Sequence, residues 1–551
     1  MKNFYLKPKL FSVLKNYTKD QFVKDVVAGI IVAIIALPLS IALALASGVE
    51  PACGVYTAIF AGFMVSFFGG SRVQIAGPTA AFATVVAGIV ATQGMDGLII
   101  ATILAGIFLI LMGVFKLGSL IKFIPYTITT GFTAGIAVTI FIGQIKDFLG
   151  LQYASGVKPI ETIEKIEANI EAIGTFSWQA LLVGAVSLAI LIVYPKFEKK
   201  VPPSLIAVIV GALMVKFIPG LDNGVFTIGE LYTIPSGFPQ FALTNMEFSF
   251  AKVSAVLPDA FTIAILAAIE SLLSCVVADS MVNSRHNSNA ELVAQGVGNI
   301  ASVLFGGIPA TGAIARTAAN AKNGGRTPIA GMVHAVVLLL VLLFLMPLAG
   351  LIPMPTIAAI LFMVAYNMSE YKKFIKTVKT APKSDIVVMV ITFGLTVIFD
   401  LVVAIEVGMI LAAMLFMKRM SEETTVKGWE YTENDTDSID LKSVPKNVRV
   451  YEISGPLFFG AADKILDITF KEYTSCLVLR MRAVSAIDAT AMNSLEQLYK
   501  KCKSKGVALV LSHVNEQPLH AMQKSGFYDK VGAENFCAHI DDALIRANEI
   551  K

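Results

Sequence analysis

The feature that most constrains this chain is a series of apolar segments of membrane-spanning length, which begins at Val26 and ends at Met417. A helix of roughly 20 apolar residues crosses a bilayer, and few other structures satisfy the backbone polar groups there. With 56% hydrophobic and 15% charged residues and a mean hydropathy of +0.72, the composition excludes an ordinary soluble protein. The sequence therefore predicts an α-helical polytopic membrane protein.

The apolar pattern divides into fourteen segments. They are 26–46, 52–69, 79–92, 97–115, 126–147, 178–195, 203–219, 255–280, 290–305, 311–321, 328–347, 350–366, 385–400 and 401–418. The third and the tenth are too short to span, and each follows a break that contains glycine and proline. We expect an N-terminal segment at 1–25, a transmembrane domain at 26–420, a linker at 421–445 and a soluble domain at 446–551.

Charged residues are distributed unevenly between the two ends of these segments. The first 25 residues are rich in lysine, and so is the stretch with Lys372, Lys373, Lys376, Lys379 and Lys383, whereas 148–177 is richer in glutamate. Lysine and arginine accumulate on the cytoplasmic side of membrane proteins. We therefore expect a multi-pass protein of the cell membrane, with both termini in the cytoplasm and no cleavable signal peptide.

The two short segments belong to a weak internal repeat. FFGG at 67–70 precedes IAGPTAAFA at 75–83, and LFGG at 304–307 precedes IPATGAIA at 308–315. Aligning Gly77 with Ala310 brings Leu37, in an ALPLS break of the first segment, onto Glu270 of the eighth. Each half is thus expected to hold an interrupted long helix and a short half-helix, as in transporters built from inverted repeats. Small residues also let membrane helices pack closely, which is the plainer explanation.

Two charges lie within this apolar region, Arg316 in the tenth segment and Glu270 in the eighth. A charge at membrane depth is kept where it faces a cavity or a partner. A half-helix that begins beside an arginine favours an anion site, because free N–H groups and the helix dipole attract negative charge. Glu270, with Ser274 one turn later, has three open interpretations: a partner for arginine, a cation ligand, or a protonatable coupling group.

Several motifs in this order resemble the sulfate permease (SulP) family of anion transporters. They are GPTAAFA at 77–83, IESLLSCVVADSM at 269–281 and the long stretch NAELVAQGVGNIASVLFGGIPATGAIARTAANAKNGGRTPIAG at 289–331. The resemblance implies seven plus seven inverted transmembrane segments, divided into a mobile core domain and a gate domain that also forms a homodimer. The anion is then expected between the N-termini of the third and tenth segments.

The resemblance also implies a set of site residues. Substrate contacts fall on Leu37, Pro38, Pro78, Thr79, Ala80, Gly312, Ala313 and Ile314. Arg316 falls where anion exchangers and plant sulfate symporters carry an arginine. Glu270 and Ser274 fall where sodium-coupled bicarbonate members carry an aspartate and a threonine that bind sodium. The pair of Glu270 and Arg316 resembles the proton-coupled sulfate carriers more closely.

These considerations predict a secondary active transporter that carries sulfate with protons by alternating access. Alternatives that stay open are sodium- or proton-coupled transport of bicarbonate or a C4-dicarboxylate, and an uncoupled anion exchanger or channel. The expected partners are a small anion, membrane lipid and a second copy of the chain. No cofactor and no nucleic acid are expected. H⁺ is favoured over Na⁺ as the coupling ion, because protonation of Glu270 would free Arg316 for an anion.

The soluble tail alternates short β-rich runs with helices and resembles a STAS domain. In IDATAM, Asp488 and Thr490 lie at the turn where related regulatory proteins carry a phosphorylated residue, so Thr490 is a candidate phosphosite, while Asp488 is expected to cap the following helix. The tail shows no nucleotide-binding loop, catalytic triad or metal cluster, and the five cysteines have no metal-type spacing. We do not expect an enzyme.

Overall fold

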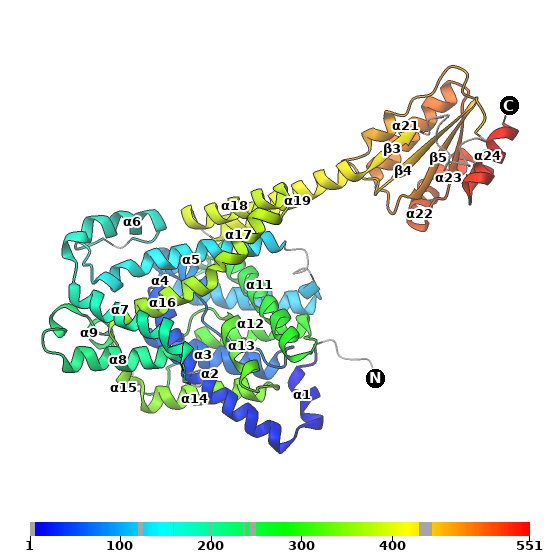
Figure 1. Ribbon diagram of the computed structural model, residues 1–551. Helices are drawn as coiled ribbons and strands as arrows, with labels where there is room; N and C mark the ends of the chain where they lie inside the picture. Colours follow the sequence, from blue (N-terminus) through cyan, green and yellow to red (C-terminus); the bar gives the residue numbers. More distant parts are fainter. Residues whose placement is uncertain are drawn as a thin grey trace. The chain divides into compact units, whose positions relative to one another are not determined.

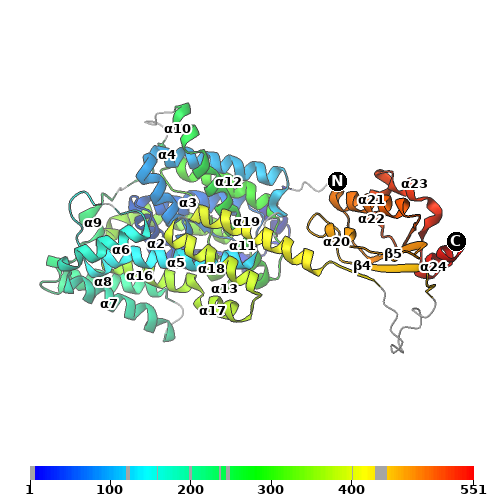
Figure 2. The ribbon, with the colours of Figure 1, turned by 90° about the horizontal axis from the view of Figure 1, so that it is seen from above.

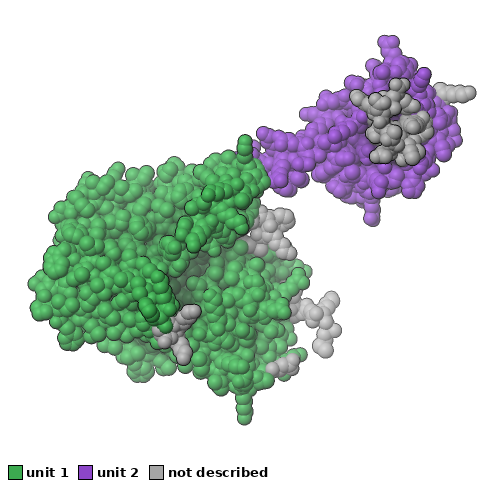
Figure 3. Space-filling model, in the orientation of Figure 1, with its two compact units in different colours: residues 1–409 green, residues 410–551 purple. Residues whose placement is uncertain are grey.

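The computed structural model describes residues 6–119, 125–157, 159–197, 201–234, 237–242, 249–399, 401–428 and 444–550. The chain divides into two compact units, residues 1–409 and 410–551, which Figure 3 draws in different colours. The division falls inside one helix, α19 (Leu401–Glu423). Most of the range predicted as a linker, 429–443, lies outside the described residues.

Helices build the first unit (Figure 1). Those that correspond to the predicted membrane segments are α2 (Lys19–Ala46), α3 (Pro51–Phe68), α4 (Ala80–Val114), α5 (Tyr126–Leu149), α7 (Trp178–Val193), α8 (Pro203–Phe217), α11 (Leu257–Val282), α12 (Ser288–Leu304), α13 (Ile314–Lys322), α14 (Ile329–Phe344), α16 (Met354–Ser369), α18 (Lys383–Ile398) and α19. Shorter helices are α1 (Lys9–Val13), α6 (Thr162–Glu171), α9 (Ile228–Leu231), α10 (Phe250–Ala255), α15 (Met346–Ala349) and α17 (Tyr371–Thr380).

Each predicted membrane segment corresponds to helix in the structure. The third and fourth segments both lie in α4, where Gly94 has a φ of 69° and interrupts the helical geometry between them. Among the described residues, six helices are long and apolar enough to cross a membrane by themselves. The two short segments behave as predicted, since α13 has only nine residues and the first part of α4 ends at the Gly94 kink.

The helices of this unit pack in two groups. In one group α12 lies against α3 and α4, while α14 lies against α2 and α3. In the other group α5 packs against α16 and α18, and α7 packs against α8 and α16. This arrangement agrees with the core and gate domains that the family resemblance implies.

Three details differ from the sequence-based prediction. The first long helix begins at Lys19 rather than near residue 26, because the Thr18 hydroxyl accepts a hydrogen bond from Gln21 N and caps it. The ALPLS motif does not interrupt that helix, since Pro38 lies inside continuous α2. Helix α11 is also unbroken around Glu270. Dense packing against neighbouring helices tolerates one proline without ending a helix.

A buried carboxylate ties the start of α2 to the segment after α13. Asp25 is fully buried and accepts hydrogen bonds from the Tyr17 hydroxyl and the Gln21 amide, both at 2.9 Å. It also accepts from the backbone N–H groups of Arg326 and Thr327 at 2.9 and 3.3 Å, and from the Thr327 hydroxyl at 2.5 Å. Residues that are 301 and 302 positions apart in the sequence are therefore held together at one point.

The second unit contains a five-stranded sheet in the order β3-β4-β5-β6-β7. Its strands are β3 (Thr425–Gly428), β4 (Val448–Ser454), β5 (Cys476–Ala483), β6 (Ala508–Ser512) and β7 (Phe536–Cys537). Strands β4 to β7 are parallel, and β3 pairs antiparallel with β4. Its helices are α20 (Asp463–Leu466), α21 (Ala489–Ser504), α22 (Glu516–Lys524), α23 (Phe527–Val531) and α24 (Ile540–Glu549). Strand β3 lies within the range predicted as a linker.

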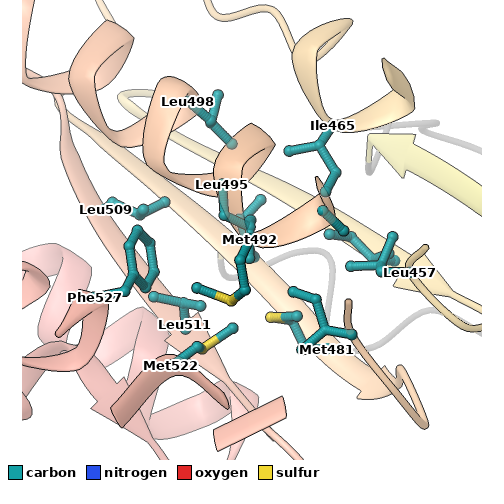
Figure 4. Packing of buried hydrophobic residues seen from close by; sticks show 14 of the residues in the cluster. Leu457, Ile465, Met481, Met492, Leu495, Leu498, Leu509, Leu511, Met522 and Phe527 are labelled. Carbon is teal, nitrogen blue, oxygen red and sulfur yellow. The ribbon is translucent and has the colours of Figure 1, made fainter. Parts of the chain in front are cut away.

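Two hydrophobic cores cover the two faces of this sheet. On β5, Leu477, Leu479 and Met481 face the larger core together with residues of α20, α21 and α22, part of which Figure 4 shows. Cys476 and Val478 face the opposite way, toward α24. This alternation is the period of two expected for a strand buried on both faces. Burial also raises the pKa of Cys476 to about 12 and that of Cys502 to about 11.

Candidate functional site

Two short strands position the candidate site. Strand β1 (Ala76–Gly77) precedes α4, and β2 (Thr311–Gly312) precedes α13. They pair antiparallel, with Ala76 opposite Gly312 and Gly77 opposite Thr311. The Ala313 N–H also donates to Ile75 O at 2.8 Å. The pairing brings together the N-termini of two helices that are more than 200 residues apart in the sequence, as the sequence analysis predicts.

Neither of these two helix N-termini has a side-chain cap. Thr79 is the N-cap of α4, but its hydroxyl donates to Glu270 Oε2 at 2.8 Å instead of accepting from the helix. Ala313 is the N-cap of α13 and has no polar side chain. The first N–H groups of a helix have no partner within the helix, and with the helix dipole they attract anions. Ile314 is 45% exposed, so the first turn of α13 is open.

Arg316 is the third residue of α13, in its first turn, and is only 1% exposed. Its Nη2 donates to the Ser40 hydroxyl of α2 at 3.2 Å and to Pro78 O at 3.3 Å. Its Nε and Nη1 are buried without a hydrogen-bond partner. Gly77 makes room for this side chain, because a Cβ there would lie 2.3 Å from Arg316 Nη1.

No described carboxylate pairs with Arg316, so the expected alternative of a direct ion pair with Glu270 is absent among those residues. Glu270 is half-buried on α11 and accepts a hydrogen bond from Thr79, the residue after Pro78. The two opposite charges therefore contact adjacent residues of one segment and form no ion pair with each other. A buried charge without a partner is costly, so a negative charge that accepts hydrogen bonds from Arg316 would be stabilised there.

Hydroxyl groups join α11 to the paired strands. The Ser271 hydroxyl accepts from Gly312 N at 3.0 Å and donates to the Thr311 hydroxyl at 3.3 Å. Ser274 is fully buried, and its hydroxyl lies 3.4 Å from that of Thr317. The structure thus places Ser274 against α13. Of the two residues predicted to couple an ion, only Glu270 contacts a residue at the start of α4.

The remaining predicted contacts lie around this point. Pro78, Ala80, Gly312 and Ala313 are buried at the two helix starts. Leu37 is half-buried and Pro38 is buried on α2, close in sequence to Ser40, which contacts Arg316. Among the described residues no three His, Cys, Asp or Glu side chains gather as a metal site.

A second polar cluster beneath the strands escaped the sequence analysis. Glu291 of α12 is fully buried and accepts from Gly70 N, Ser71 N and the amide groups of Gln74 and Gln295 at 2.9–3.1 Å. Gln74 Nε2 also donates to Ser271 O. A Cβ on Gly312 would lie 2.0 Å from this nitrogen. The sequence feature that could have indicated this cluster is the pair Glu291 and Gln295, two polar residues one helical turn apart inside an apolar segment.

In the second unit, the sequence-based interpretation of the IDATAM turn can be examined directly. Asp488 is the N-cap of α21 and accepts from Ala491 N at 2.8 Å, which confirms the capping role. Its other oxygen accepts from Phe459 N at 2.9 Å. Thr490 is exposed on the first turn of α21, and its phosphorylation stays a prediction.

Comparison with known proteins agrees with this organisation. Residues 22–392 match the sulfate permease family and residues 440–543 match the STAS domain. The chain is 41% identical to YvdB of Bacillus subtilis, whose name gives sulfate as a provisional substrate, over 96% of this chain and 98% of that protein. It is 31% identical to the bicarbonate transporter BicA of Picosynechococcus, over 95% and 94% of the two chains.

A solved structure supports the fold. The murine solute carrier 26 family member A9 anion transporter, in its inward-facing state, superimposes with a TM-score of 0.88 over 99% of this chain and 94% of that one, at 17% identity. The relatives are transporters rather than enzymes, in agreement with the prediction. With the family match over most of its length and the paired helix starts around Arg316, the chain belongs to the sulfate permease family of membrane anion transporters and carries a C-terminal STAS domain.

Proposed function

We propose that this protein is a secondary active transporter that carries sulfate together with protons, and that the anion binds between the starts of α4 and α13. The observation that carries the proposal is Arg316. It is buried, its Nε and Nη1 have no partner, and it lies behind two helix N-termini that lack side-chain caps. A transported anion would supply the missing acceptor and the missing negative charge.

Glu270 supports coupling to protons. In its ionised form it adds a negative charge next to Thr79, at the same helix start that would receive the anion. Protonation removes that charge, so proton and anion favour each other's binding. Ser274 contacts Thr317, and this supports protons over a sodium ion held jointly by Glu270 and Ser274.

Sulfate is the proposed substrate because the matched family and YvdB are both named for it. The specific observation that favours a second candidate, bicarbonate, is the 31% identity to BicA over nearly the whole chain. Backbone N–H groups bind oxyanions of several shapes, so the helix starts accommodate either substrate. A C4-dicarboxylate is the third candidate to include in a test.

The deciding experiment uses the purified full-length chain in proteoliposomes. Uptake of radiolabelled sulfate, bicarbonate and succinate is measured with an inward proton gradient, with an inward sodium gradient and with neither. We expect sulfate to accumulate only under the proton gradient. Arg316→Ala should abolish uptake of every anion, with insertion and folding intact. Sodium-driven bicarbonate accumulation would replace the proposal, and normal anion affinity in Arg316→Ala would refute the site.

A further inference from the structure

Helix α17 has two distinct faces. Its sequence is YKKFIKTVKT, and Tyr371, Phe374, Ile375 and Val378 recur with the spacing of one helical face. Lys372, Lys376 and Lys379 recur at intervals of four and three residues on an adjacent face. The charge of these lysines is typical of the cytoplasmic side of a membrane protein. Their arrangement on a helix gives them a further role.

Phe374, on the apolar face, and Lys373 anchor α17 to the first unit. The ring of Phe374 lies 5.6 Å from that of Phe393 on α18. Lys373 Nζ lies 2.8 Å from Glu370 Oε2 and 4.6 Å from the centre of the Tyr126 ring on α5. Glu370 itself has a φ of 40°, which turns the chain sharply between α16 and α17. The helix is thus held beside α18, as Figures 1 and 2 both show.

The rest of the apolar face of α17 and its lysine-rich flank are exposed. Tyr371, Ile375 and Val378 are 42%, 47% and 39% exposed, and the helix has no buried residue. Within the described part of the chain, no carboxylate pairs with Lys372, Lys376 or Lys379, and Lys373 takes the one nearby acid, Glu370. This exposed surface therefore joins an apolar strip to three lysines whose charge is not compensated.

The position of α17 in the chain indicates the surroundings of its exposed surface. It connects α16 and α18, two segments predicted to cross the membrane, so its ends lie at a membrane boundary. A helix there with an apolar strip and a lysine-rich flank lies in the headgroup layer, with the strip toward the acyl chains. Lysines reach out to phosphates while their stems stay on the apolar side. Three exposed apolar residues are too few for a stable protein–protein interface.

We propose that α17 is a binding site for anionic phospholipid headgroups, in which Lys372, Lys376 and Lys379 contact lipid phosphates and Tyr371, Ile375 and Val378 enter the acyl region. This surface is separate from the anion site at Arg316, and the proposal does not depend on which solute is transported. The ligand is a phosphodiester that belongs to the membrane, because the apolar strip adds affinity only for a ligand with acyl chains.

The test uses the full-length protein in vesicles of phosphatidylcholine that contain some phosphatidylglycerol. A photoactivatable phosphatidylglycerol and a photoactivatable phosphatidylcholine are compared, and crosslinks to residues 371–383 are quantified by mass spectrometry. We expect labelling by the anionic lipid to exceed that by the neutral lipid at least about fivefold, the factor for roughly one lysine at a charged surface. Added inorganic phosphate should not compete, whereas high salt should reduce the ratio.

Replacing Lys372, Lys376 and Lys379 together by glutamine should bring the ratio close to one. The matched control replaces Lys500, Lys503 and Lys524, exposed lysines of the second unit, and makes the same charge change. That control should keep the wild-type ratio. Ile375→Ser with Val378→Ser should reduce labelling by both lipids.

Three results would overturn the proposal. They are equal labelling of the wild-type protein by the two lipids, an unchanged ratio in the triple lysine variant, and crosslinks of 371–383 to another protein chain in place of lipid. Competition by inorganic phosphate would identify a free-anion site and would also overturn it. Transport by the triple variant in neutral vesicles confirms that the protein is folded.

Discussion

The surroundings of Glu270 and of Glu291 differ in how many hydrogen-bond donors they offer to a carboxylate. Glu291 accepts four hydrogen bonds, two from backbone N–H groups and two from glutamine amides. Glu270 accepts one from the Thr79 hydroxyl, with the Thr311 hydroxyl close by. The hydrogen-bond capacity of the Glu291 carboxylate is therefore largely used within the protein, whereas that of Glu270 is mostly unused by the described residues.

This difference separates two functions for the same side chain. Glu291 has a structural role. It accepts a hydrogen bond from Gly70 in the loop before β1, and it holds Gln74, whose amide lies against Gly312. Glu270 has few partners to lose and lies at the helix start proposed for the anion. A glutamate that takes up and releases a proton needs an environment that accepts both forms.

Glu291→Ala should have the largest effect, and the effect should be on folding. The change leaves at least two buried donors unsatisfied, at about 1–3 kcal/mol each. We expect unfolding of the detergent-solubilised protein at clearly lower temperature and a reduced yield. Glu167→Ala, at an exposed position of α6, is the control and should melt like the wild type. A melting temperature of Glu291→Ala equal to that of the wild type would contradict the structural role of Glu291.

Arg316→Met should give the opposite pattern. An apolar side chain of similar length replaces a buried charge without a carboxylate partner, so stability in the absence of anion should be equal or higher. Anion affinity should fall by about 100-fold, the effect of losing one or two charge-assisted hydrogen bonds. Melting temperatures with and without sulfate measure both quantities. Stabilisation of the variant by sulfate as strong as in the wild type would count against the site.

Glu270→Gln should leave folding and anion exchange almost intact. The amide keeps the shape of the side chain and fixes its neutral form, so exchange of labelled anion continues while acceleration by an inward proton gradient disappears. Uptake against pH, with and without sodium, is the measurement. If Glu270 instead binds sodium, stimulation by sodium is lost and the pH profile stays as in the wild type. Proton-driven accumulation by the variant would refute the role assigned to Glu270.

Thr79 provides the smallest test. Thr79→Val removes the donor to Glu270 but keeps the branched shape, and a single hydrogen bond of this kind contributes about 1 kcal/mol, or roughly fivefold in an equilibrium. We expect a change of that size in the apparent affinity of the transport cycle for protons, read from uptake at several pH values. Thr79→Ser retains a hydroxyl and should restore the wild-type profile. Equal pH profiles of uptake for Thr79→Val and the wild type would show that the hydrogen bond from Thr79 to Glu270 has no part in proton coupling.

The sequence predicted the helices well because every backbone polar group inside a bilayer must be hydrogen-bonded within the protein, and an apolar helix achieves this. The apolar runs therefore marked the membrane helices, and the two glycine- and proline-rich breaks marked the short ones. The same rule does not determine whether a proline ends a helix. Pro38 lies within α2, because packing around it decides the outcome. Strand β3 was missed since four residues within a polar stretch form a strand only by pairing with β4.

The candidate site was predictable in part. Arg316 and Glu270 stood out as charges in apolar segments, and in the structure they contact the adjacent residues Pro78 and Thr79. The absence of a direct contact between Arg316 and Glu270 depends on the directions of their side chains. The positions of the two residues in the sequence do not determine these directions. Ser40, Gln74 and Glu291 were missed because their importance comes from partners more than 200 residues away. No local pattern reports such contacts.

The contacts of Asp25 have a consequence for the synthesis of the protein. Its partners Arg326 and Thr327 follow it by 301 and 302 residues, and β1 likewise waits for β2. The N-terminal half enters the membrane first, so during translation Asp25 lacks its partners Arg326 and Thr327, and β1 lacks β2. The proposed anion site is therefore completed late, after the tenth segment has left the ribosome. A nascent chain that ends before residue 311 should insert into the membrane and still bind no anion.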